Sequence, residues 1–80
     1  MVFRSGRTEA LTAARKLVRG FAAAPDPRQH AHRVFSELAH AEGWRAEEQA
    51  LITELGAWLQ GRPSLGELKT RCEATLARLR

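Results

Sequence analysis

The chain has 80 residues, of which 44% are hydrophobic, and its 13 basic and 9 acidic side chains give a formal net charge of +4. This length allows one domain with one modest core, so we expect residues 1–80 to form a single domain. No segment approaches the roughly 20 apolar residues of a membrane span, and the single cysteine allows no intramolecular disulfide. These features exclude a membrane-spanning helix and a disulfide framework, and they predict a cytoplasmic protein.

Alanine and leucine are abundant, whereas β-branched residues are scarce and tyrosine is absent. This composition is typical of helices rather than sheets. We therefore predict an all-α fold, a small bundle of about four short amphipathic helices. Because so short a chain buries little apolar surface, we also expect dimerisation or docking on a partner to help complete the core.

The first helix is expected over roughly residues 8–22, with Thr8 or Ser5 as its N-cap. On a helical wheel its apolar side chains share one arc and its basic side chains share the opposite arc. The apolar arc holds Ala10, Leu11, Ala14, Leu17, Val18 and Phe21, and the opposite arc holds Thr8, Thr12, Arg15, Lys16 and Arg19. The segment is therefore predicted to bury one face and to expose a basic one.

The second helix is expected over roughly residues 27–42, after Asp26, which is a typical N-cap residue. Gly43 is the kind of residue that adopts a left-handed conformation just beyond the end of a helix. Trp44 follows at a position where an apolar residue often packs back on the last turn. These residues predict that the helix continues almost to Gly43.

The third helix is expected over roughly residues 46–60, with Glu47 and Glu48 in its first turn, where the helix dipole favours acidic side chains. Glu48 falls inside the apolar arc of this helix, and capping of the first turn accounts for its position. The small residues Ala46, Ala50 and Ala57 share another side of the helix, which suggests a seam for self-association.

The fourth helix is expected over roughly residues 65–79, after a capping box formed by Ser64 and Glu67. Its apolar residues form a narrow stripe with the spacing of coiled-coil a and d positions. The stripe consists of Leu65, Leu68, Cys72, Leu76 and Leu79. Because Cys72 lies inside this stripe, burial should raise the pKa of its thiol and leave it unreactive.

Charge is distributed unevenly, since residues 1–33 and 61–80 are predominantly basic and residues 34–60 are predominantly acidic. One interpretation is internal complementarity, in which the acidic third helix packs beside the basic helices. A basic face that stays exposed would instead attract an acidic surface. We predict a non-enzymatic protein–protein interaction module, a regulator, adaptor or inhibitor that binds a larger partner with an acidic surface and forms a homodimer. The predicted partner-binding residues are Arg15, Lys16, Arg19 and Trp44.

The alternative interpretation is a basic nucleic-acid-associated protein that contacts phosphates with the arginines of its first and last helices. A helix-turn-helix is disfavoured, because the helix after Gly43 begins with Glu47 and Glu48, which phosphates repel. The predicted phosphate contacts near the first helix are Arg4, Arg7, Arg15, Lys16 and Arg19.

The histidines do not predict a metal site. His30 and His32 are two residues apart, which on a helix points them about 200° from each other. They therefore do not clasp one ion as an i, i+4 pair does. No motif indicates a phosphate-binding loop or a nucleophile held beside a base. We expect no metal, no cofactor and no catalytic residue.

A third function comes from a resemblance carried by two residues. Arg33 and His40 are separated by six residues on the exposed side of the second helix, and this spacing resembles the active-site pair of the HEPN ribonucleases. In that family an arginine and a histidine act on an RNA phosphodiester across a dimer, so the resemblance implies RNA cleavage. Val34 stands where a polar residue commonly follows the family's arginine.

Overall fold

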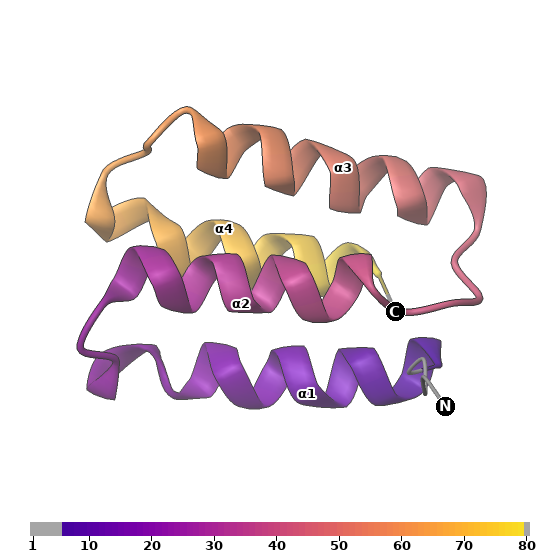
Figure 1. The fold of residues 1–80 in the computed structure, drawn as a ribbon, viewed down its shortest axis with the longest axis horizontal. Coiled ribbons are helices and arrows are strands. Elements are labelled where there is room, and N and C mark those ends of the chain that lie inside the picture. Colours follow the sequence, from indigo (N-terminus) through magenta and orange to yellow (C-terminus); the bar gives the residue numbers. More distant parts are fainter. Residues whose placement is uncertain (1–5, 80) are drawn as a thin grey trace.

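The computed structural model describes residues 6–79, and the chain there forms four α-helices and one short 3₁₀ segment (Figure 1). The all-α prediction is confirmed. In chain order the elements are α1 (Arg7–Arg19), η1 (Phe21–Ala23), α2 (Pro27–Ala39), α3 (Ala46–Gln60) and α4 (Leu65–Arg78). No helix in the described part of the chain combines the length and the apolar character needed to cross a membrane.

The helices form a bundle in which α2 and α4 contact each other and also contact both other helices. Figure 1 shows α2 between α1 and α3, with α4 behind, and consecutive helices running in opposite directions. The helices α1 and α3 therefore lie on opposite sides of the bundle. This arrangement leaves one surface groove between α1 and α4 and another between α3 and α4.

The core contains the inner face of every helix, including most of the apolar arc predicted for the first helix and most of the stripe predicted for the fourth. Its members are buried side chains from α1, η1, α2, α3 and α4, together with the residue after α4. They are Leu11, Ala14, Val18, Phe21, Ala31, Val34, Leu38, Ile52, Leu55, Leu59, Leu68, Cys72, Leu76 and Leu79. Leu65, expected in the apolar stripe of α4, is 55% exposed because it is the first residue of the helix, beyond the end of the packed region.

The start of α1 differs from the prediction. The N-cap is Gly6, no side chain caps the helix, and Arg7 is already helical. Thr8 lies inside the first turn, and Ser5 lies outside the described residues. The helix begins at this point because tertiary contacts hold it: Gly6 forms a β-bridge with Glu42, and Arg7 donates hydrogen bonds to groups of α3 and of the chain after α4.

The other end of α1 is also earlier than expected. Helix α1 ends at Arg19 and Gly20 is its C-cap, so that Phe21 enters the core from a 3₁₀ turn instead of a fourth helical turn. His30 of α2 closes this corner, since its Nε2 donates a hydrogen bond to the carbonyl of Leu17. The imidazole also meets the Phe21 ring edge to face, with 4.8 Å between the ring centroids.

Helix α2 begins as predicted, because the carboxylate of Asp26 accepts a hydrogen bond of 3.2 Å from the backbone N–H of Gln29. It ends at Ala39, three residues before the expected end. The indole N–H of Trp44 donates to the carbonyl of Leu38 at 2.8 Å, so Trp44 does pack back on the last turn. Gly43 has the expected positive φ, 93°, but within the connecting loop, not next to the helix end.

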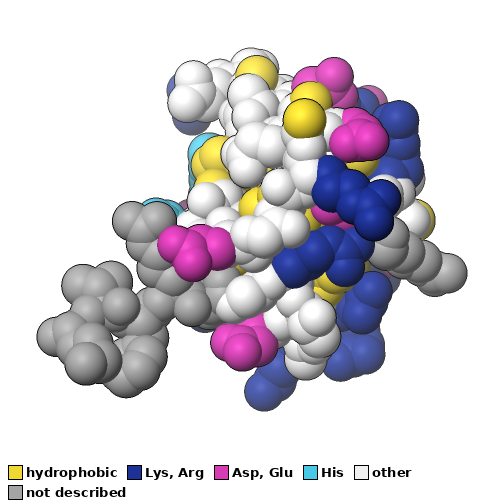
Figure 2. All heavy atoms as spheres, turned by 90° about the vertical axis from the view of Figure 1, so that its right-hand side faces the viewer, with side chains coloured by type: hydrophobic (Ala, Val, Ile, Leu, Met, Phe, Trp, Pro, Cys, Tyr) yellow, Lys and Arg dark blue, Asp and Glu magenta, His cyan; other side chains and the backbone are white. Residues whose placement is uncertain are grey.

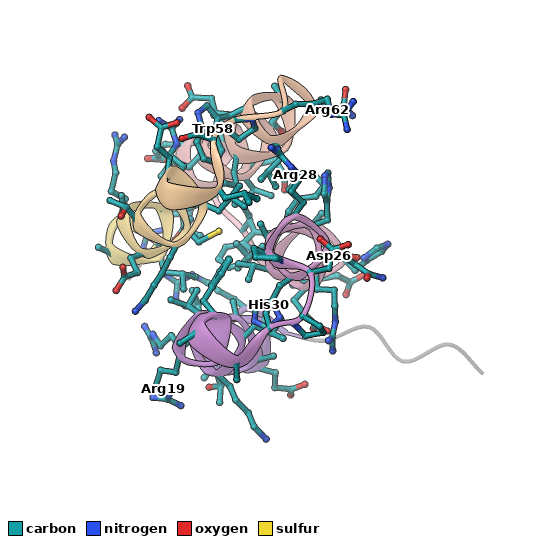
Figure 3. The ribbon with its side chains drawn as sticks, turned by 90° about the vertical axis from the view of Figure 1, so that its left-hand side faces the viewer. Arg19, Asp26, Arg28, His30, Trp58 and Arg62 are labelled. Carbon is teal, nitrogen blue, oxygen red and sulfur yellow. The ribbon has the colours of Figure 1, made fainter. Side chains whose placement is uncertain are left out.

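The α3–α4 connection contains a second left-handed residue, Arg62, with φ of 53°. At the same end of the bundle, Nη1 of Arg28 donates to the carbonyl of Pro63 at 2.7 Å and ties the start of α2 to this loop (Figure 3). Ser64 is the N-cap of α4, but its hydroxyl donates to the carboxylate of Glu67 at 2.9 Å and no backbone N–H donates to it. The predicted capping box is thus replaced by a side-chain pair.

Candidate functional site

An open groove of about 270 Å³ lies between α1 and α4. We call it the basic groove. It is lined by Arg15, Val18 and Arg19 of α1 and by Glu73, Leu76 and Ala77 of α4. The two helices contribute residues with the same i, i+3, i+4 spacing, which places each trio on one helix face.

The basic groove combines an aliphatic floor with charged edges. Val18 and Leu76 are each 6% exposed and belong to the core, whereas Arg15 and Arg19 are exposed. Figure 3 shows Arg19 extending from α1 into solvent on the side where α4 lies. Glu73 is the acidic residue of the lining. A ligand here would meet two guanidinium groups above a strip of aliphatic surface.

The third basic residue predicted for this face is not part of the groove. Lys16 is exposed, but its position, about 100° from Arg15 around the helix, turns it away from α4. Figure 2 shows Lys and Arg side chains gathered mainly on the right-hand side of that view. Of the predicted basic trio, the structure thus brings together Arg15 and Arg19.

Trp44, also predicted to bind a partner, is half-buried at the opposite end of α1. Besides its hydrogen bond to Leu38, its ring lies under the guanidinium of Arg7, 5.7 Å from the ring centroid. The ring packs against the core, as expected of a residue that closes a helix end. It therefore contributes to the packing at this end and does not line the basic groove.

Arg7, which we predicted to contact phosphate, binds groups within the protein. Its guanidinium forms an ion pair of 2.8 Å with Glu48 and donates to the carbonyl of Leu79 at 2.6 Å. Glu48 also accepts the backbone N–H of Arg45 at 3.0 Å, so its capping role is confirmed. Arg4 lies outside the described residues. The predicted set of five phosphate contacts is thereby reduced to Arg15, Lys16 and Arg19 on the described surface.

No family model matches this chain, and no curated protein or solved structure is significantly similar to it. The function is therefore inferred from side-chain geometry and charge.

Of the two residues that resemble the HEPN pair, Arg33 lies in the middle of α2 and His40 at its C-terminal end. Arg33 borders a small cavity of about 130 Å³ together with Asp26 and His30. His40 is the C-cap residue, and its Nδ1 donates to the carbonyl of Ser36 at 2.8 Å. The step of seven residues from Arg33 to His40 corresponds to about 10 Å along a helix axis. The chain by itself does not place them around one reacting group.

His30 and His32 do not converge, since His30 is turned toward Leu17 and His32 is exposed. Within residues 6–79, no three His, Cys, Asp or Glu side chains are grouped so as to hold a metal ion. Cys72 is fully buried, and burial, followed by the nearby charge of Glu73, raises the pKa of its thiol to about 11. The predicted rise in this pKa is confirmed.

A second surface feature, the groove between α3 and α4, was missed by the sequence analysis. It consists of two cavities of about 310 and 100 Å³ that share Arg71 and Ala74. Trp58 of α3 is half-buried here, with the guanidinium of Arg71 above it at 5.4 Å from the ring centroid. The available signal was the contrast between an acidic α3 and a largely basic α4.

Proposed function

We propose that this protein is a small cytoplasmic interaction module that binds an acidic amphipathic segment of a larger protein in the basic groove, and so regulates, recruits or inhibits that protein. The observation that carries the proposal is the position of Arg15 and Arg19, exposed beside the aliphatic floor formed by Val18 and Leu76. Neither feature alone would select such a ligand.

The spacing of the two arginines supports a helical ligand. Arg15 and Arg19 are one helical turn apart, about 6 Å along the axis of α1. Carboxylates at positions i and i+4 of a partner helix have the same spacing, and guanidinium groups bind carboxylates in a bidentate manner. An aliphatic residue between those carboxylates would contact Val18 and Leu76, which is the usual helix-in-groove mode of recognition.

The dimensions of the groove favour surface recognition. Its volume of about 270 Å³ lies at or below the lower end of the roughly 300–1,000 Å³ of sites that enclose small molecules. The groove is also open along its length and combines two cations with one acid, Glu73. These properties support binding of a protein segment over conversion of an enclosed substrate.

Binding of nucleic acid remains the second proposal, because Arg15, Lys16 and Arg19 are all exposed on one helix. Phosphate contacts would use all three cations, whereas a segment in the basic groove would use only the two arginines. The internal ion pair of Arg7 and the acid Glu73 in the groove both favour the protein ligand. The role of Lys16 therefore distinguishes the two functions.

The experiment uses a fluorescein-labelled amphipathic helical peptide with two glutamates four residues apart and leucines on the same face. We expect Arg15→Glu with Arg19→Glu to weaken its binding at least about tenfold, which corresponds to about 1.4 kcal/mol. The matched control, Lys16→Glu with Arg33→Glu, makes the same change in net charge at exposed helical positions outside the basic groove. The control should bind within about threefold of the wild type.

Two outcomes would contradict the proposal. Equal losses in both double variants would indicate a general effect of net charge. Tighter binding to duplex DNA than to the peptide, with a loss of at least about tenfold between 50 and 200 mM salt, would assign the face to phosphate contacts.

A further inference from the structure

We propose that the groove between α3 and α4 is a homodimer interface in which α3 of each copy packs on α4 of the other. This inference concerns a different face from the basic groove and does not depend on its ligand. It would supply the additional burial that so small a core favours.

The centre of this face has the composition of an interface. Leu51 and Trp58 of α3 are half-buried and pack against the core, while the indole also borders the larger of the two cavities. Arg71 covers one face of that indole and connects the two cavities. Tryptophan and arginine are the residue types most enriched among the energetically dominant contacts of protein interfaces.

The edges of the same face carry opposite charges. The helix α3 contains acidic residues and no Lys or Arg, and its Glu54 lines the smaller cavity. On the facing helix, Arg71 and Arg78 line that same cavity. Around the smaller cavity the face is therefore acidic on α3 and basic on α4, whereas the acidic Glu67 of α4 lines the larger cavity.

Symmetry determines how two such faces meet. A two-fold axis that runs along the groove, parallel to the helices, places α3 of one copy over α4 of the other. Glu54 of each copy then faces Arg71 and Arg78 of its partner, and each contact occurs twice, as an isologous interface requires. An axis perpendicular to the helices would instead place α3 over α3 and bring like charges together.

The small size of this face indicates a weak dimer. The helices α3 and α4 are 15 and 14 residues long, about 21 Å each, and each is about 10 Å wide. Their joint face has a flat area of roughly 400 Å², against the roughly 800 Å² per partner of a standard interface. Interfaces at this low end are typical of weak, transient association, so the dimer should dissociate on dilution.

The test measures molar mass by light scattering and sedimentation between about 5 and 500 µM, a range in which a weak dimer forms and dissociates. Wild-type mass should rise with concentration toward twice the 8.9 kDa of one chain. The variants Glu54→Arg and Arg71→Glu should each keep the mass of one chain over the same range. The matched controls, Glu37→Arg and Arg33→Glu, make the same changes at exposed positions of α2 and should dimerise like the wild type.

The deciding measurement mixes the two interface variants, Glu54→Arg and Arg71→Glu, in equal amounts. In the mixed pair, the new arginine at position 54 of one variant faces the new glutamate at position 71 of the other, on one side of the axis. The wild-type charges face each other on the other side, so opposite charges meet on both sides and a heterodimer should form. Because both variants must be folded to do so, this result separates a lost interface from a lost fold. Wild-type protein that stays monomeric at about 500 µM, a dimer that persists in Glu54→Arg, or a mixture without a heterodimer would each overturn the proposal.

Discussion

Arg7, the first residue of α1, and Glu48, in the first turn of α3, are joined by two hydrogen bonds of 3.1 and 2.8 Å across 41 residues of sequence. The second oxygen of Glu48 caps α3 at Arg45, and the guanidinium of Arg7 also holds the carbonyl of Leu79. This one pair therefore connects the starts of two helices with the end of a third. Because the Arg7–Glu48 pair is partly buried beside Trp44, it is a structural contact.

The pair predicts a pH-dependent contribution to stability. The hydrogen bond from Arg7 and then that from the Arg45 backbone hold the pKa of Glu48 below its ordinary value of 4.5. Since the folded-state pKa is the lower one, the stabilisation is fully present above pH 4.5 and is lost as the pH falls through the folded-state pKa. Glu48→Gln should therefore lower the urea midpoint at pH 7, and the difference from the wild type should shrink at about pH 3.

The neighbouring residue provides the control for this measurement. Glu47 is exposed in the same helical turn, so Glu47→Gln should differ little from the wild type at either pH. A deficit for Glu48→Gln that is equally large at both pH values would show that the carboxylate charge is not what stabilises the pair.

A side chain at Gly56 is expected to destabilise the fold. A Cβ at this buried position of α3 would lie 2.6 Å from the ring of Phe35 in α2, closer than real contacts allow. Alanine gains up to about 1 kcal/mol of helix propensity over glycine, but overpacking costs about 1–3 kcal/mol. Gly56→Ala should therefore lower the free energy of unfolding by about 1 kcal/mol, measured by urea denaturation.

Gly66 in α4 is the matched position, because a Cβ there would meet nothing within 4 Å. Gly66→Ala should stabilise the protein by about 0.5 kcal/mol. If both alanine variants were stabilised alike, the close approach of α2 and α3 at Gly56 would be wrong.

Cys72 should be protected from alkylation in the folded protein. Its thiol is fully buried, and its pKa of about 11 leaves little thiolate at pH 8. Introducing a second cysteine at exposed Ala77, just over one turn further along α4, gives an internal reference in the same molecule. Peptide mapping after iodoacetamide treatment should show Cys72 reacting at least about a hundredfold more slowly than the new cysteine.

Urea provides the check on this protection. The rate difference should disappear once the chain is unfolded, because both thiols are then exposed. Equal rates in the folded protein would place Cys72 at the surface.

A charge introduced into the apolar stripe of α4 should strongly destabilise the fold. Leu68 is 1% exposed and Leu76 is 6% exposed. An aspartate at either position costs several kcal/mol, a large part of the roughly 5–15 kcal/mol that holds a typical domain together. Leu68→Asp and Leu76→Asp should abolish the cooperative thermal transition in circular dichroism.

The first leucine of the same helix is the control. Leu65 is 55% exposed, so Leu65→Asp should leave the thermal midpoint within a few degrees of the wild type. A normal transition in Leu68→Asp would contradict the buried position of this stripe.

The sequence by itself determined the helices and most of their buried faces. Asp26 marks the start of α2, and the spacing of Leu68, Cys72 and Leu76 marks the inner face of α4, because caps and apolar periodicity depend on residues within a few positions of each other. The early end of α2 was not predictable in this way. The chain beyond this end forms a bridge between Glu42 and Gly6, which joins distant parts of the sequence.

Only the tertiary structure decided which charged residues remain available for binding. Arg7 and Arg15 both look like exposed cations on the first helix, but Arg7 meets Glu48 whereas Arg15 borders the basic groove. Lys16 and Arg19 differ in the same way, because α4 packs beside Arg19 to form the groove and does not reach Lys16. The physical reason is that the sequence shows where a charged residue stands but not what packs beside it. The residue that neutralises the charge, or the helix that completes a groove next to it, comes from a segment more than 40 residues away.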